Sequence, residues 1–174
     1  MFRLPFRALL ALLMLAGTVP VRADELADAQ RLWLAQRRGE AVAQVEAALK
    51  KTPDDLRLRF ALGVMTMELG QQARARALFQ ALTQEHPDLA DPHNNLAVLQ
   101  AAAGDLDGAR ASLEQALRLQ PDHQQAQENL GDVLLRLATR AYERAAQGPA
   151  PTTPSVQNKL QRTQSLTRDL NLSH

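Results

Sequence analysis

The feature that most constrains this chain is a dipeptide that recurs at a fixed distance. Pro-Asp stands at positions 53–54, 87–88 and 121–122, so two equal steps separate the three copies. A leucine followed by glycine or alanine keeps the same step, at 62–63, 96–97 and 130–131. A fixed period of about 34 residues is typical of stacked supersecondary units, so the chain is predicted to be a repeat protein.

Each unit is predicted to contain two helices joined by a tight turn. Proline cannot continue a helix, so Pro-Asp ends one unit, and its aspartate is expected to cap the next helix. Gly70 and Gly104 are separated by the same period and are expected to end the first helix in the left-handed conformation. The small residue after each leucine is expected to let the adjacent helix approach closely. In the shorter first unit, helices are expected on either side of Arg38-Gly39.

Composition supports an all-α fold and excludes some functions. Aromatic residues make up 3% of the 174 residues, which disfavours a β-sandwich or barrel. The absence of cysteine excludes disulfides and a thiolate nucleophile. With 20 basic and 19 acidic residues, the chain lacks the strongly basic surface that binds nucleic acid, so no nucleic-acid partner is expected.

Residues 1–23 have the three-part layout of a secretory signal peptide. Arg3 and Arg7 precede the apolar run 8–16, and Val21 and Ala23 suit a signal peptidase, so cleavage is predicted after Ala23. The alternative is an uncleaved membrane anchor. The run is about half of the roughly 20 apolar residues that span a bilayer, so no stable membrane span is expected after cleavage.

The remaining chain is predicted to form a repeat domain, a linker and a last helix. The predicted segments are the repeat domain 24–147 with units 25–53, 56–87 and 90–121 and a long closing helix 122–147, the proline-rich linker 148–154, and the C-terminal helix 155–171. The closing helix is expected to be long because no glycine interrupts the stretch LLRLATRAYERAAQ, residues 134–147. The last helix has a thin apolar stripe, so it either caps the final repeat, which is the simpler interpretation, or waits for a partner.

These features together resemble the tetratricopeptide repeat. The best copy keeps the family pattern at Leu96, Ala97, Gly104, Ala109, Leu113, Ala116 and Pro121. The strings PHNNLAVL and ENLGDVLLRLATRAYERA are similar to those of small secreted tetratricopeptide proteins of Gram-negative bacteria. The resemblance implies a solenoid of stacked antiparallel helix pairs, with the closing helix and the C-terminal helix at its end. With the signal peptide, it implies a periplasmic protein.

The resemblance also implies a binding groove. In this family the first helices of successive units line a concave groove that holds a peptide or a partner helix. By the repeat step, the groove-facing residues are expected to be Phe60, Val64 and Met67, then Asn94, Asn95, Val98 and Ala101, then Glu128, Asn129, Asp132 and Leu135. An asparagine side chain offers both a donor and an acceptor to a peptide backbone. The alternative is that Asn95 and Asn129 bond between helices and that Val64 and Val98 belong to the core.

One known mode of the family is not expected. The clamp for a C-terminal carboxylate, found in chaperone cofactors, needs lysine and asparagine on the first helices. The corresponding positions here hold Phe60, Asn94 and Glu128, and the lysines are confined to Lys50, Lys51 and Lys159.

No motif in the sequence indicates catalysis. The four histidines lack the spacing of a metal site, the serines lack a nucleophile elbow, and no glycine-rich phosphate loop occurs. The paired aspartates Asp54-Asp55 and Asp105 with Asp107 are interpreted as helix caps. The sequence therefore predicts a non-catalytic periplasmic adaptor without cofactor or metal, which binds a protein or peptide of the cell envelope in its groove. The alternatives are a structural subunit that uses its convex face or last helix, and an assembly factor for unfolded clients.

Overall fold

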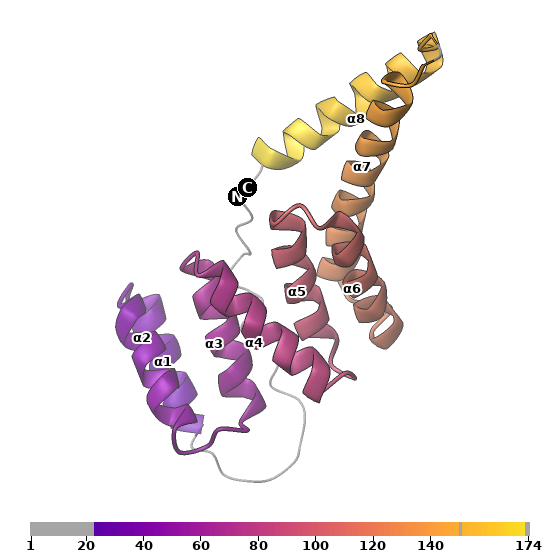
Figure 1. Ribbon diagram of the computed structural model, residues 1–174. Helices are drawn as coiled ribbons and strands as arrows, with labels where there is room; N and C mark the ends of the chain where they lie inside the picture. The colour runs from indigo at the N-terminus through magenta and orange to yellow at the C-terminus, as the bar shows by residue number, and fades with distance from the viewer. Residues whose placement is uncertain (1–22, 150, 173–174) are drawn as a thin grey trace. The chain divides into compact units, whose positions relative to one another are not determined.

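The computed structural model describes residues 23–149 and 151–172, which form eight α-helices and no strand (Figure 1). In chain order the helices are α1 (Ala23–Leu34), α2 (Arg38–Leu49), α3 (Leu56–Glu68), α4 (Gln72–Glu85), α5 (Ala90–Ala102), α6 (Leu106–Leu119), α7 (Gln124–Ala146) and α8 (Pro154–Leu172). The predicted all-α repeat fold is confirmed, with its long closing helix α7 and its C-terminal helix α8. Except for Ala23, the predicted signal peptide lies outside the described residues.

The chain divides into two compact units, each with its own core. The N-terminal unit comprises α1 to α4 and ends at Asp88, and the C-terminal unit comprises α5 to α8 and begins at Leu89. The N-terminal core consists of Ala29, Trp33, Ala41, Val42, Val45, Ala48, Leu58, Leu62 and Met65. The C-terminal core consists of Ala97, Ala101, Leu106, Ala109, Leu113, Ala116, Ala126 and Val133. Both cores use alanine where two helices meet closely.

The helix starts correct one prediction. Pro-Asp forms a turn in all three copies, and the residue that follows it, rather than the aspartate itself, is the N-cap. At α3 the cap is Asp55, whose carboxylate accepts hydrogen bonds from the backbone N–H groups of Arg57 and Leu58 at 2.9 and 3.1 Å. The turn uses both residues of the dipeptide, so one more extended residue is needed before the helix begins.

The turn between the two helices of each repeat follows the prediction in two of three repeats. Gly70 and Gly104 have φ of +73° and +82°, the left-handed conformation expected of them. In the first repeat, the predicted position of the turn at Arg38-Gly39 is wrong, because both residues lie inside α2. Gln36 takes the left-handed position instead, with φ of +62°. The earlier turn places the Arg38 guanidinium over the Trp33 ring, 5.3 Å from its centroid.

The small residue after the repeated leucine was expected to let the adjacent helix approach closely, and this is only partly observed. A Cβ atom at Gly63 would lie 2.8 Å from Cζ of Phe79 on α4, so only glycine fits there. Ala97 is fully buried in the next unit. At Gly131 a Cβ atom would meet nothing within 4 Å, so the close approach expected there does not occur.

None of the helices in residues 23–149 and 151–172 has the length and apolar content that a bilayer span requires.

Candidate functional site

The three groove residues predicted on α3 lie in the N-terminal unit, where α3 packs against α4. Phe60 is half-buried, and its ring meets the ring of Phe79 edge to face, with centroids 5.7 Å apart. Val64 is buried and Met67 is half-buried. The aromatic contact fixes the Phe60 ring against its own helix pair, so Met67 is the more adaptable of the two larger side chains.

The residues predicted on α5 and α7 lie in the C-terminal unit, and one pair of them is in direct contact. The side-chain amide of Asn129 donates to the Oδ1 atom of Asn94 at 2.8 Å, and both side chains are buried. The amide of Gln125 donates to the Oδ1 atom of Asn129 at 3.4 Å. Buried amides need hydrogen-bond partners. The bond between Asn94 and Asn129 meets this need and joins α5 to α7.

Asn95 and Asn129 are equivalent by period but differ in their contacts. Asn95 is buried, and its amide donates to the carbonyl oxygen of Asp91 in its own helix at 3.0 Å. Val98 is buried, while Glu128 is exposed and Asp132 is half-buried. The bond of Asn129 to α5 and the burial of both valines are what the alternative interpretation expects for those residues. The groove assignment as a whole stays a prediction.

A polar contact that the sequence did not suggest lies at the same end of α5 and α7. His123 is the N-cap of α7: its Nδ1 atom accepts from the backbone N–H of Ala126 at 3.3 Å, and its Nε2 atom lies 3.1 Å from Oδ1 of Asp91. The contact with Asp91 raises the pKa of His123, although burial of the ring opposes it. Both residues stand near helix starts, but their separation along the chain differs from the repeat period, so no repeat signal could reveal the pair.

A second cluster joins α1, α2 and α3 in the N-terminal unit. Burial raises the pKa of the Glu68 carboxyl, while the Arg38 charge and a hydrogen bond with Trp33 oppose that rise. Glu68 on α3 thus has a hydrogen bond to α1 and a favourable charge on α2. Among the described residues, no three histidine, aspartate or glutamate side chains come close enough together to hold a metal ion.

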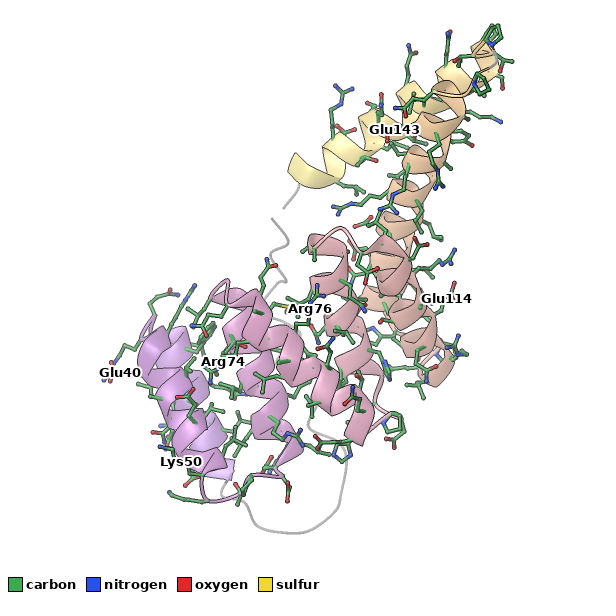
Figure 2. All side chains as sticks on the ribbon, viewed as in Figure 1. Glu40, Lys50, Arg74, Arg76, Glu114 and Glu143 are labelled. Carbon is green, nitrogen blue, oxygen red and sulfur yellow. The ribbon has the colours of Figure 1, made fainter. Side chains whose placement is uncertain are left out.

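Helix α8 returns along α7 and covers part of its surface (Figure 1). The Oγ1 atoms of Thr139 and Thr167 are 3.2 Å apart, and the Gln164 amide donates to Oε1 of Glu143 at 3.2 Å. Figure 2 labels Glu143 where the two helices lie alongside each other. The sequence left open whether this last helix packs on the final repeat, and the structure places it against α7.

The succession of helical hairpins defines a helical-repeat protein, and sequence comparison identifies which kind. The family model of the tetratricopeptide repeat matches residues 26–90 and 94–148, so the chain belongs to the tetratricopeptide repeat family. A tetratricopeptide-repeat-containing protein of Pseudomonas aeruginosa is 34% identical over 99 residues, which cover 56% of this chain and 93% of that protein.

Solved structures of the family share this fold at low sequence identity. The first tetratricopeptide domain of RPAP3, bound to the HSP90 peptide SRMEEVD, has a TM-score of 0.61 and 16% identity, with 66% of this chain and 90% of that one covered. MamA of Desulfovibrio magneticus has a TM-score of 0.59 and 15% identity, with 83% and 75% covered. A tetratricopeptide protein of Thermus thermophilus has a TM-score of 0.58 and 20% identity, with 80% and 79% covered.

Proposed function

We propose that this protein is a non-catalytic adaptor of the bacterial periplasm, which holds a segment of another envelope protein against the first helices of its repeats. The observation that carries the proposal is the tetratricopeptide fold, because proteins of this family bind protein or peptide partners. In the C-terminal unit, the buried bond between Asn94 and Asn129 joins α5 to α7, and the exposed carboxylate of Glu128 on α7 can make a polar contact with a partner. Such a surface can bind a chain segment through polar contacts.

The proposed partner differs from the ligand of the RPAP3 domain. That ligand, the peptide SRMEEVD, carries three acidic residues. The predicted groove positions on α7 here include Glu128 and Asp132, which repel an acidic peptide. We therefore extend only the binding of a chain segment to this protein, and propose a segment without net negative charge.

The test of the binding face compares two charge reversals in a pull-down from periplasmic extract. Glu128→Lys changes the proposed face on α7, and Glu114→Lys changes an exposed position on the second helix α6 (Figure 2). The expected result is a partner, identified by mass spectrometry, that the native chain and the Glu114 variant retain and the Glu128 variant loses. A partner that both variants retain equally would remove the first helices from the proposal.

The test of the location is separate. Expression of the full chain in a Gram-negative host, followed by fractionation, is expected to yield a periplasmic protein with Asp24 as its first residue. Recovery of the chain in the cytosol with Met1 intact would contradict the periplasmic part of the proposal and leave the binding part standing.

A further inference from the structure

We propose that α8 occupies a helix-binding surface on α7, and that the partner of this surface is an amphipathic helix that displaces α8. The inference rests on the proposed function, because the inference says where on the first helices the partner binds and that the partner is a helix. Three observations carry it: the course of one stripe along α7, the contacts that α8 makes on it, and the weakness of those contacts.

The stripe begins among the predicted groove residues and continues beyond them. Glu128, Asp132 and Leu135 follow one another at steps of four and three residues, so they lie on one face of α7. The same alternation continues through Thr139, Tyr142 and Ala146 to the end of the helix. The additional length of α7 therefore extends the predicted groove face by about three turns.

Helix α8 lies on this extension and runs antiparallel to α7. Thr152, just before α8, donates its hydroxyl to the carbonyl oxygen of Ala146 at 2.9 Å, and the Lys159 ammonium lies 5.9 Å from the centre of the Tyr142 ring. Further along, Thr167 meets Thr139. Residues later in α8 contact residues earlier in α7, so the stripe binds a helix in the antiparallel orientation.

The face of α8 that lies against α7 is only weakly apolar and shallowly buried. Its inward positions, again at steps of four and three, are Val156, Leu160, Thr163, Thr167 and Leu170, and each of these is only half-buried. Among residues 154–170 no side chain is buried, in contrast to the cores of both units. The hydroxyls of Thr163 and Thr167 bond to carbonyl oxygens of α8 itself, so they add little across the interface.

A partner helix with leucine at the two threonine positions would bury more apolar surface on α7 than α8 does. Thr139 would lose its contact with Thr167 but keep its hydrogen bond to the carbonyl oxygen of Leu135, at 2.9 Å. The partner must outcompete α8 at the effective concentration that the linker 148–153 provides, of the order of millimolar. A stronger apolar stripe is therefore the property that identifies the partner.

The experiment locks α8 in place within the full-length chain. The chain contains no cysteine, so Thr139→Cys with Thr167→Cys introduces a single pair, at positions whose side-chain oxygens are 3.2 Å apart. The probe is a fluorescent synthetic peptide of residues 154–172 that carries Thr163→Leu and Thr167→Leu. Fluorescence anisotropy is expected to show binding to the reduced chain, at least tenfold weaker binding after oxidation, and recovery after reduction. The wild-type chain under both redox conditions is the control.

Two results would overturn the inference: equal binding to the oxidised and reduced chains, and no binding to either. Hydrogen exchange of the wild-type chain gives an independent measurement. Saturation with the peptide is expected to accelerate amide exchange in residues 154–172 of the chain, and unchanged exchange there would show that α8 is a fixed cap.

The outcomes separate this inference from the adaptor proposal. An envelope partner that the locked and unlocked chains capture equally would preserve the adaptor and eliminate the displacement of α8. An unlocked chain that binds the peptide, while neither form captures an envelope partner, would preserve the helix-binding surface and eliminate the adaptor.

Discussion

Three glycines of the repeats are subject to different structural constraints. Gly63 is required because the Phe79 ring leaves no room for a Cβ atom. Gly70 is required because its φ of +73° is strained for residues with a side chain. Gly131 occupies the same repeat position as Gly63 but has neither constraint. The sequence alone shows the position, and only the packing shows the role.

The first prediction compares Gly63→Ala with Gly131→Ala. A methyl group at Gly63 overlaps Phe79, so the free energy of unfolding is expected to fall by about 1–3 kcal/mol. At Gly131, within α7, the methyl group meets nothing and improves helix propensity, so the free energy is expected to rise by about 0.5–1 kcal/mol. Urea unfolding followed by circular dichroism measures both. A loss at both positions would contradict the assignment of different roles.

The second prediction concerns the turn between α1 and α2. Gln36 has a φ of +62°, a conformation that costs a residue with a side chain roughly 1–2 kcal/mol. Gln36→Gly is expected to raise the unfolding midpoint, by an amount that the greater freedom of glycine in the unfolded chain reduces. Thermal unfolding of Gln36→Ala is the control, which should show no gain. A lower midpoint for the glycine variant would place the turn elsewhere.

At the scale of elements, α5 and α7 are joined by polar contacts as well as by their apolar core. The bond between Asn94 and Asn129 is buried, and the pair Asp91 and His123 lies near the starts of the same helices. Apolar packing alone tolerates sliding between helices, whereas a buried hydrogen bond allows only one register. These contacts therefore fix the register of the predicted binding face.

The third prediction tests the buried amide pair. Asn94→Ala and Asn129→Ala each leave a buried polar group without its partner, so each is expected to lower the free energy of unfolding by about 1–3 kcal/mol. The double variant is expected to lose less than the sum, because it leaves no orphaned group from the pair. Chemical denaturation of wild type, the two single variants and the double variant gives a double-mutant cycle. Strictly additive losses in the free energy of unfolding would show that the two amides act independently.

The fourth prediction is the pH dependence of the His123 contact. The Asp91 carboxylate raises the pKa of His123 in the folded chain above its ordinary value of 6.5. The contribution of the pair to the free energy of unfolding is therefore fully present below about pH 6.5, and it is lost as the pH rises through the raised pKa. Its size is expected to be at most about 1 kcal/mol, because Asp91 is partly open to solvent.

The measurement compares wild type with His123→Asn, which keeps a capping oxygen but no titrating group. The difference in the free energy of unfolding is expected to be larger near pH 5.5 than near pH 8.5. In an Asp91→Asn background, where the largest cause of the raised pKa is removed, the excess at pH 5.5 over pH 8.5 should shrink. A difference that grows towards alkaline pH would reverse the sign assigned to the contact.

At the scale of the whole molecule, charge contributes little to stability. The chain has a net charge of +1, and ion pairs such as Arg59 with Glu85 and Lys51 with Glu25 each have one well exposed partner. Exposed pairs contribute about 0–1 kcal/mol each and are screened by salt. The two apolar cores therefore account for most of the stability.

The fifth prediction follows from this distribution. Raising the sodium chloride concentration from about 0.05 M to about 1 M is expected to change the free energy of unfolding by less than about 1 kcal/mol, since the screened pairs are weak. Urea denaturation at both concentrations measures the change. A drop of several kcal/mol would show that the surface ion pairs act as a cooperative network.

The fold could be predicted from the sequence because its signals are local and repeated. Proline stops, left-handed glycines and the alternation of apolar residues each recur with the same period, so one unit confirms another. The details that the period did not predict are set by contacts between residues outside it. The turn at Gln36 lies next to the buried Trp33, and the hydrogen bond between Asn129 and Asn94 forms where α5 and α7 meet. The α8 contacts have no repeat counterpart at all.

The length of α7 has a consequence for how this chain can grow. Repeat arrays lengthen by duplication of a unit, and each copy needs a turn that folds its second helix back on its first. One repeat period after Gly104 stands Ala138, and the helix continues through it for a total of 23 residues. Without a turn at this position, α7 does not divide into the two short helices of a repeat. A further unit inserted before Asp122 would therefore leave α7 and α8 together as one unchanged pair.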